Sequence, residues 1–246
     1  MSHHLVEVKD LFYNYPDGSE VLSGISFRIT HGESVAIVGE NGAGKSTLLL
    51  HLNGYYAPAK GEVRVGDMPV VKSTLNEIRK TVGMLFQDSD DQLFMPTVFD
   101  DVAFGPLNLG IPDAEVERKV AQALECAGVL HLKERSTHKL STGEKKAVAF
   151  AGILAMSPDI LVLDEPSASL DPKARRRMIK MLKSFTHTKI IATHDLDMAY
   201  ELCDRVIVMH EGKIAADDTP DNIFTNDELL ERCMLERPLS MQDDDY

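Results

Sequence analysis

The chain has 246 residues, which is long enough to bury a core as one domain or as a domain with a subdomain. Its hydrophobic content of 43% and charged content of 26% are ordinary for a globular protein. The 26 Lys and Arg against 39 Asp and Glu give a net charge of −13, which disfavours a nucleic-acid binder without excluding a local basic patch.

The cysteines and the hydropathy pattern indicate which compartment and which class of protein, soluble, secreted or membrane-spanning, the chain fits best. The three cysteines lack metal-ligand spacing and fit buried thiols in a reducing cytoplasm better than disulfides (Cys126, Cys203 and Cys233). No apolar run approaches the ~18 residues of a membrane span, and residues 1–5 lack a signal-peptide pattern. We therefore expect a protein that is soluble by itself and needs a spanning partner for any work at a membrane.

The N-terminal part of the chain predicts strands. Residues 5–8 and 21–27 have β-rich patterns on either side of a turn at residues 16–18, which favours two antiparallel strands. Two more strands follow at residues 61–65 and 82–86.

A Gly-rich loop from Gly39 to Thr47 matches the phosphate-binding pattern G-x-x-x-x-G-K-[ST] without a mismatch. Gly39 and Gly44 let the loop bend so that backbone N–H groups point at an anion, Lys45 reaches the β- and γ-phosphates, and the Ser46 hydroxyl can ligate Mg²⁺. A buried strand at residues 34–38 precedes the loop. The loop residues predicted to bind nucleotide are Gly39, Glu40, Asn41, Gly42, Ala43, Gly44, Lys45, Ser46 and Thr47.

The segment after the loop supplies the rest of the expected context. Residues 47–52 start a helix that Gly54 could end. A helix that begins at the loop aims the partial positive charge of its N-terminus at the phosphates. We conclude that the chain binds a nucleoside triphosphate.

From about residue 91 to about residue 157 the pattern becomes helical. Asp113 can cap a helix whose apolar residues share one face and which Gly128 closes, and a second helix begins near Ser141. Alternation of strands and helices then resumes, with strands at residues 160–163, 189–193 and 205–209 and a helix at 172–185. This order predicts a mostly parallel α/β core interrupted by a helical insertion.

Two carboxylates follow the strand at residues 160–163. Asp164 can hold Mg²⁺ directly or through water, and Glu165 could orient and deprotonate an attacking water molecule. Alone, apolar residues followed by two acids can be purely structural. The phosphate loop favours the functional interpretation.

Two further side chains follow predicted strands and so belong to the same edge of the sheet. His194 comes directly after the strand at residues 189–193, which favours a contact with the γ-phosphate over a structural histidine. Gln87 presents an amide after the strand at residues 82–86 and would carry no weight alone.

Residues 140–144 open the second predicted helix. Ser141 and Glu144 fit the capping box S-x-x-E, which is a structural role. In addition, Ser141 and the N–H of Gly143 could form a second anion site at this helix N-terminus.

The order of these segments resembles that of ABC-transporter ATPases over nearly the whole chain. Residues 166 and 169–171 also match the family pattern. The resemblance implies a P-loop NTPase core with an N-terminal antiparallel β subdomain and an inserted α-helical subdomain. It implies one domain over 1–240, with the core at about 1–90 and 158–235, the helical subdomain at about 91–157, and an acidic tail at 241–246.

The same resemblance implies a head-to-tail dimer, with an identical or a paralogous subunit, that sandwiches two ATP molecules. Ser141, Gly143 and Glu144 of one subunit would face the phosphate loop of the other, and Asp171 would help to connect the two sites. Tyr15 lies where the family places an adenine-stacking ring, within one residue. Gln87 and Asp164 would complete the Mg²⁺ site, with Glu165 as general base and His194 as γ-phosphate sensor.

A narrower resemblance covers residues 87–106, which are similar to the ATPases of energy-coupling factor importers, with the cobalt-transport ATPase nearest. This implies uptake of cobalt or nickel, or alternatively of a vitamin, from the cytoplasmic face of the membrane. Membrane subunits would dock near residues 87–94, where Asp88, Asp90 and Asp91 could pair with basic partners or form a solvated loop.

Other function classes are less favoured. A non-transport ABC protein acting on nucleic acid usually has two ATPase units or a long insertion. A small-molecule kinase would lack the motif that this chain has at residues 140–144. The basic run at residues 175–177 is better explained as a solvated helix face than as a nucleic-acid or lipid site.

The segment at residues 140–144 departs from the usual L-S-G-G-Q at Thr142 and Glu144. Thr142 would be strained by about 1–3 kcal/mol if its φ were positive, but would cost little in a helical conformation. Glu144 adds negative charge near the partner's ATP. We expect Glu144→Gln to hydrolyse ATP faster than the parent in a steady-state assay, and an unchanged rate would contradict this.

Overall fold

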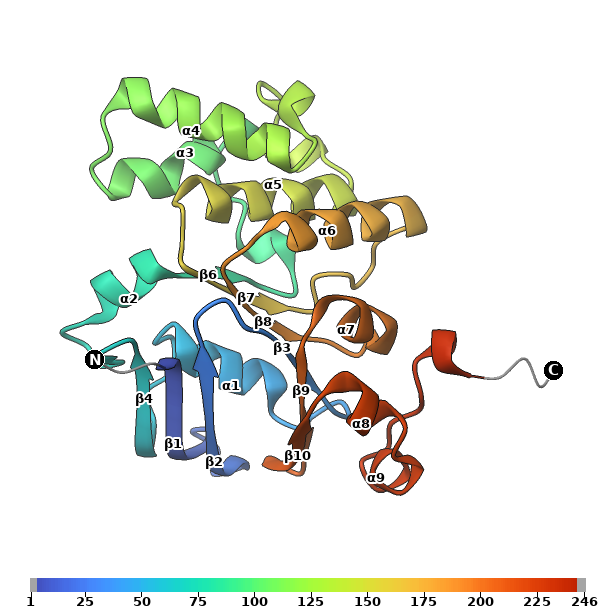
Figure 1. Cartoon of the computed structure of the whole chain (residues 1–246). Helices are drawn as coiled ribbons and strands as arrows, with labels where there is room; N and C mark the ends of the chain where they lie inside the picture. Colours follow the sequence, from blue (N-terminus) through green and yellow to red (C-terminus); the bar gives the residue numbers. More distant parts are fainter. Residues whose placement is uncertain (1–3, 243–246) are drawn as a thin grey trace.

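The computed structural model describes residues 4–242, so the predicted acidic tail lies outside the described residues from residue 243 onward. Two sheets, a central helix between them and an outer group of helices make up this part of the chain (Figure 1). The α/β fold with an antiparallel β subdomain and inserted helices is confirmed.

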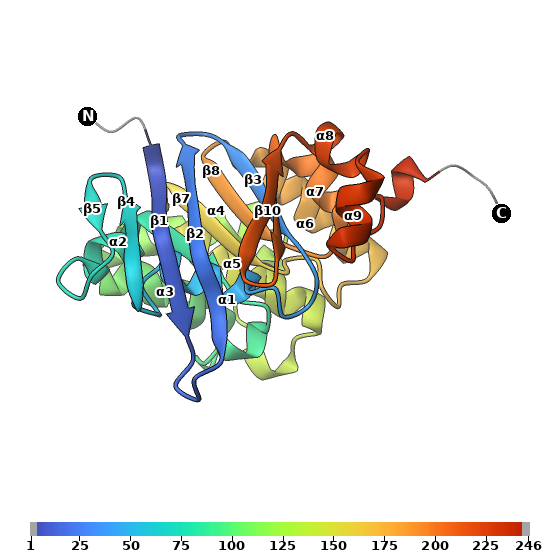
Figure 2. The same ribbon diagram turned by 90° about the horizontal axis from the view of Figure 1, so that it is seen from below.

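The smaller sheet is antiparallel and has the strand order β2-β1-β4-β5. Its long strands lie side by side in Figure 2. The predicted pair around the turn at residues 16–18 is confirmed. The strands are β1 (His4–Asn14), β2 (Glu20–Thr30), β4 (Lys60–Val65) and β5 (Met68–Pro69).

The larger sheet has the order β10-β9-β3-β8-β7-β6, in which only β10 runs antiparallel to its neighbour. Every residue of β3, β6, β7 and β8 is buried, as expected for parallel strands covered on both faces. The strands are β3 (Ser34–Val38), β6 (Val82–Leu85), β7 (Ile160–Asp164), β8 (Thr188–Ala192), β9 (Arg205–His210) and β10 (Lys213–Asp218).

Helix α1 (Lys45–Leu52) lies between the two sheets and contacts strands of both. Most of its residues are buried, and these include the polar Lys45, Thr47 and His51 as well as the leucines. It begins at Lys45, two residues before the predicted start, because Gly44 provides the left-handed turn into the helix with φ +97°.

The helical region contains α3 (Val98–Asn108), α4 (Asp113–Cys126) and α5 (Thr142–Ala155). Helices α4 and α5 were predicted, and Gly128 follows α4 with φ +68°. Asp113 is not the cap: Pro112 occupies that position, and Asp113 is the first helical residue without a capping bond from its side chain. Proline fits there because its extended backbone and fixed φ lead into the helix.

The remaining helices are α2, α6, α7, α8 and α9, of which only α6 was predicted. The other four have five to seven residues, which is too short for a periodic apolar pattern to show. Their bounds are α2 (Leu75–Thr81), α6 (Pro172–Ser184), α7 (Leu196–Leu202), α8 (Pro220–Phe224) and α9 (Asp227–Arg232). Short 3₁₀ segments occupy Ser89–Asp91, Leu130–Leu132, Thr137–Lys139 and Leu239–Met241.

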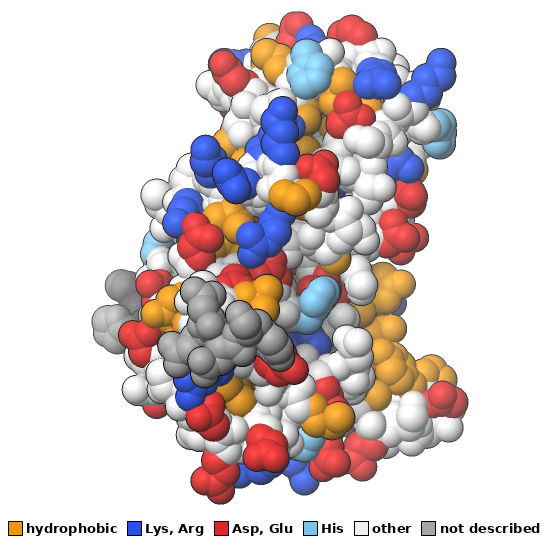
Figure 3. Space-filling model, turned by 90° about the vertical axis from the view of Figure 1, so that its right-hand side faces the viewer, with side chains coloured by type: hydrophobic (Ala, Val, Ile, Leu, Met, Phe, Trp, Pro, Cys, Tyr) orange, Lys and Arg blue, Asp and Glu red, His pale blue; other side chains and the backbone are white. Residues whose placement is uncertain are grey.

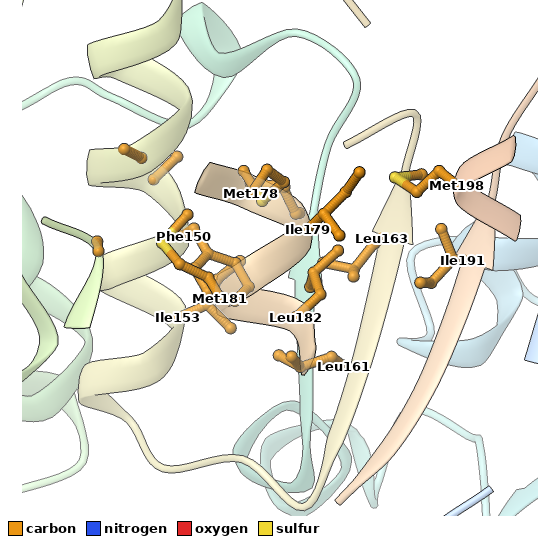
Figure 4. Close-up of a cluster of buried hydrophobic side chains, with 14 of the residues drawn as sticks. Phe150, Ile153, Leu161, Leu163, Met178, Ile179, Met181, Leu182, Ile191 and Met198 are labelled. Atoms are coloured by element: carbon orange, nitrogen blue, oxygen red, sulfur yellow. The ribbon is translucent and has the colours of Figure 1, made fainter. Parts of the chain in front are cut away.

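Helix α6 packs between the larger sheet and the helical region, as Figure 4 shows. Its buried side chains meet Phe150 of α5 on one side and Leu161 and Leu163 of β7 on the other. One continuous hydrophobic cluster therefore serves the helices and this face of the sheet, while a second cluster fills the space between the two sheets.

Arg205 joins the two sheets at the edge far from the phosphate loop. Its guanidinium donates to Asp217 on β10 at 2.5 and 2.6 Å, to Glu33 at 3.0 Å and to the carbonyl of Arg28 on β2 at 2.8 Å. Burial raises the pKa of Glu33, but hydrogen bonds from Thr30 and Arg205 outweigh it and hold that pKa below the ordinary value.

Arg205→Ala is expected to lower the free energy of unfolding by about 2 kcal/mol at pH 7, because charge-assisted hydrogen bonds are lost. The pKa of Glu33 is lowered in the folded state, so its contribution exists above its unfolded pKa and disappears as the pH falls through the folded pKa. The difference between parent and variant should therefore shrink below pH 4.5 in urea titrations. Arg232→Ala, an exposed change on α9, is the control and should stay within about 0.5 kcal/mol.

Candidate functional site

The carboxyl ends of adjacent parallel strands place the predicted site residues at one edge of the larger sheet. The phosphate loop follows β3, Asp164 ends β7, His194 follows β8, and Gln87 follows β6. A cavity of about 570 Å³ opens there. It is lined by Tyr15, Val21, Asn41, Gly42, Gly44, Lys45, Ser46, Thr47, Gln87, Glu165 and His194.

Close backbone approach requires glycine at two positions of the loop. A Cβ on Gly39 would lie 2.2 Å from the carbonyl oxygen of Met209, and a Cβ on Gly44 would lie 2.9 Å from that of Val21. Both residues also have φ in the left-handed range, +153° and +97°. The loop is thereby held against β9 and β2, while Glu40 and Ala43 belong to it without lining the cavity.

Lys45 is buried beneath the loop, and its ammonium donates to the carbonyls of Gly39 at 2.8 Å and Glu40 at 3.0 Å. Burial lowers the pKa of Lys45, opposed by the carboxylates of Glu165, Asp164 and Glu40. The ammonium therefore stands where it can turn from loop carbonyls to an entering phosphate.

Asp164 has the features of a ligand for a hard cation. It is 6% exposed, and its Oδ1 has no hydrogen-bond partner among the described residues. Burial raises its pKa, opposed by a hydrogen bond from Ser46. A carboxylate and a hydroxyl side by side, next to a phosphate cradle, fit Mg²⁺, which usually binds through one or two protein oxygens, water and substrate phosphates.

Glu165 and His194 form a direct pair. The His194 Nδ1 lies 2.8 Å from the Glu165 Oε2, which also accepts from the His194 N–H at 3.2 Å and the Thr193 hydroxyl at 3.3 Å. The Glu165 side chain is 8% exposed, whereas that of His194 is 65% exposed. Glu165 also has φ +47°, an uncommon conformation for a residue with a side chain, and it lines the cavity.

Tyr15 stands at the rim of the cavity, with its hydroxyl 2.8 Å from that of Thr47. Behind it, Tyr13 stacks on Tyr56 with ring centroids 4.9 Å apart and meets His51 edge-on. Tyr13 does not line the cavity, so Tyr15 is the ring of this cluster that can face a base.

The second predicted anion site is separate from the first. Ser141, Gly143, Glu144 and Asp171 line another cavity, of about 220 Å³. The capping box is confirmed, with the Ser141 N–H donating to Glu144 at 2.8 Å. Asp171 caps α6 by accepting from the N–H groups of Lys173 and Ala174.

The two departures at residues 142 and 144 have a local explanation. Thr142 is the first residue of α5 and is not among the residues with positive φ, so the strain considered above does not arise. The Glu144 carboxylate bonds to Ser141 and lies 3.4 Å from Arg135. These contacts, the Ser141 backbone bond first, lower the pKa of Glu144.

The acidic stretch after Gln87 is only partly free for a partner. Asp88 caps the 3₁₀ turn by accepting from the N–H of Asp90 at 2.9 Å, and Asp90 pairs with Lys145 of α5. A cavity of about 600 Å³ beside this stretch is shared by Gln87 and Asp164.

Two contacts that tie the site together were not predicted. Lys146 is buried and donates to the carbonyls of Glu165 at 2.9 Å and Ala168 at 3.2 Å. Arg175 pairs with Asp195, so it does not belong to a solvated face as expected for residues 175–177. The position of Asp195 directly after His194 was the one signal in the sequence that could have suggested the contact with Arg175.

Within residues 4–242, no helix has both the length and the apolar character to cross a membrane. In the same part of the chain, no group of three His, Cys, Asp or Glu side chains could hold a metal ion.

A profile of the ABC transporter family matches residues 22–168. Among curated relatives, a protein of Geobacter sulfurreducens named as an ABC transporter ATP-binding protein is 68% identical over 242 residues, covering 98% of this chain and 97% of the relative. The energy-coupling factor transporter ATP-binding protein EcfA of Methanocaldococcus jannaschii is 49% identical, covering 96% and 86% of the two chains.

Solved structures agree in fold. The cbiO1 protein of Clostridium perfringens, described as part of the ABC transporter complex cbiONQ, has a TM-score of 0.82 at 40% identity and 94% coverage of both chains. A dimeric ATP-binding cassette in a post-hydrolysis state with ADP and phosphate has a TM-score of 0.80 at 26% identity, covering 87% of this chain and 98% of that one.

Proposed function

The chain belongs to the ABC transporter family of ATP-binding ATPases, and on that premise we propose that it powers an importer of the energy-coupling factor type. The observation that carries the proposal is the meeting of Lys45, Glu165 and His194 in one cavity at the sheet edge. This cavity has the groups needed to bind a triphosphate and to activate water.

Binding comes first. The loop N–H groups and the N-terminus of α1 hold the phosphates, and Lys45 exchanges its bonds to the loop carbonyls for bonds to phosphate oxygens. Tyr15 stacks on the adenine. Ser46, Asp164 and Gln87 would hold Mg²⁺, which would neutralise charge on the phosphates.

Hydrolysis uses the Glu165–His194 pair. Glu165 accepts the proton of the attacking water as general base, and its position is fixed by three donors from the segment at residues 193–194. His194 is exposed toward the cavity and contacts the γ-phosphate. One side chain thus orients the base and senses the substrate.

The dimer supplies the other half of each site. The cavity of Ser141 and Gly143 is distinct from the nucleotide cavity of the same chain, which supports a role for these residues at the nucleotide of a second subunit. Asp171 lies at the same cavity and connects the two sites. The partner is an identical or a paralogous chain.

Glu165→Gln is expected to bind ATP with affinity close to that of the parent, but to reduce turnover by about 10²–10⁴-fold, because the amide cannot accept the proton. The trapped nucleotide should hold a dimer, measured by light scattering with ATP and Mg²⁺. His194→Ala should also lose turnover. Glu125→Gln, an exposed change on α4, is the matched control, and parental turnover in Glu165→Gln would disprove the assignment of the base.

Membrane subunits dock on a groove between α2, α3 and α5, at the end of the acidic stretch at residues 87–94. The groove encloses about 740 Å³ and is lined in part by Phe94, Phe104 and Asp101. The two rings meet edge-on at 4.8 Å and are 58% and 41% exposed. Exposed aromatic side chains beside a groove are typical of a protein interaction site.

The transported substrate is a transition-metal ion, cobalt or nickel, with a vitamin as the alternative. Support for the metal comes from the likeness to cbiO1 of the complex cbiONQ, and support for the wider class from the EcfA relatives. In this role the protein is peripheral, on the cytoplasmic face of the membrane.

Phe104→Glu is expected to abolish co-purification of membrane subunits from detergent extracts, because it places a charge in the groove. ATP binding by the isolated chain should not change. Leu130→Glu is the matched control, since Leu130 is 40% exposed and lies outside the groove. Mass spectrometry of the parental complex identifies the subunits, and isolation with soluble partners only would contradict the transport role.

A further inference from the structure

A bidentate ion pair joins α6 to the segment that carries His194. The Arg175 Nε and Nη2 donate to the two carboxylate oxygens of Asp195 at 2.6 and 2.7 Å. Two parallel charge-assisted bonds fix both distance and orientation, which a lysine could not do.

Asp195 is the centre of a wider set of contacts. It also accepts from the Ser167 hydroxyl at 3.0 Å and caps α7 by accepting from the Met198 N–H at 3.0 Å. Ser167 belongs to the turn that follows Glu165, so Asp195 binds that turn, α6 and α7 at one point.

The contacts continue from Asp195 to the proposed catalytic pair. The Asp195 N–H donates to the Thr193 hydroxyl at 3.0 Å, and that hydroxyl donates to Glu165 at 3.3 Å. His194 lies between Thr193 and Asp195 in the sequence, so its backbone is held on both sides. Asp195 is therefore linked to Glu165 through the Thr193 hydroxyl and through the backbone of His194.

Arg175 stands apart from its two basic neighbours. Arg176 and Arg177 are exposed, and neither has an ion-pair partner among residues 4–242. Figure 3 shows Lys and Arg side chains gathered on the face of the molecule to which α6 belongs. Arg175 alone turns inward from this basic run, and its side chain is 34% exposed.

We propose that Arg175 is a positioning residue for ATP hydrolysis, which acts through Asp195 to hold His194 against Glu165. Because Arg175 lies in the first turn of α6, the same pair also holds the start of the helix that Asp171 caps, and the dimer proposal assigns Asp171 to the connection between the two sites. The inference rests on the proposed roles of Glu165 and His194.

The pair stays charged across the working pH range. Burial raises the pKa of Asp195, but the hydrogen bond from Arg175 and the α7 cap outweigh it and lower that pKa, while the Asp195 bond raises the pKa of Arg175. The loss of activity on breaking the pair should therefore be the same at every pH from 6 to 9.

The test compares steady-state ATPase kinetics, ATP affinity and melting temperature of five variants of the full chain. Arg175→Ala should lower kcat about tenfold to a hundredfold with KM and ATP affinity within about twofold, because a misplaced reacting group costs rate more than binding. Arg175→Lys should recover part of kcat. Arg176→Ala, one residue along the helix, is the control and should match the parent.

Asp195→Asn keeps an acceptor for the α7 cap but removes the charge. It should lower kcat as Arg175→Ala does, and the double variant should be no slower than either single one. If Arg175→Ala fails to fold, Arg175→Lys and Asp195→Asn carry the same test.

Three outcomes would overturn the inference: parental kcat in Arg175→Ala, an equal loss in Arg176→Ala, or losses that multiply in the double variant. Failure of the proposed function is distinct. If Glu165→Gln keeps full turnover, the base is wrongly assigned; if it loses turnover while Arg175→Ala keeps the parental kcat, only the present inference falls.

Discussion

Opposite charges buried at one sheet edge are the constraint on which the site depends. Lys45 and Asp164 have both been taken out of water, and neither is fully compensated: the ammonium bonds to neutral carbonyls, and one carboxylate oxygen has no partner among the described residues. Buried charges of this kind destabilise a folded protein until a counter-charge arrives. A triphosphate would supply the counter-charge for Lys45 and the proposed Mg²⁺ that for Asp164, so binding of both would stabilise the folded state.

At the start of α5, residues 142–144 also bring a charge together with groups that stabilise it. Glu144 brings a negative charge to the proposed second anion site, but the capping box directs this carboxylate to its own helix N-terminus, with Arg135 3.4 Å away. Helix N-termini stabilise one negative charge, and here that charge is supplied by the chain itself. Gly143 remains available beside it at the second cavity.

Prediction from sequence succeeded where the signal is local. The strand Ser34–Val38 and the loop after it are contiguous, and β7 runs straight into Asp164, so apolar runs and neighbouring motifs located the sheet edge. The Arg175–Asp195 and Lys146–Glu165 contacts join residues about twenty positions apart on different elements. From sequence alone, a charged side chain is predicted to be exposed to solvent, because the neighbouring residues in the sequence do not reveal its ion-pair or hydrogen-bond partner.

Helix α6 contacts the helical region, the larger sheet and the segment that carries His194. It shares one hydrophobic cluster with α5 and with the face of the larger sheet, so the helical region cannot shift without acting on α6. Asp171, which caps this helix, lines the second cavity. Arg175, in the first turn, forms an ion pair with Asp195 next to His194. Packed side chains and one bidentate ion pair therefore form a continuous set of contacts from the helical region through α6 to the proposed catalytic pair.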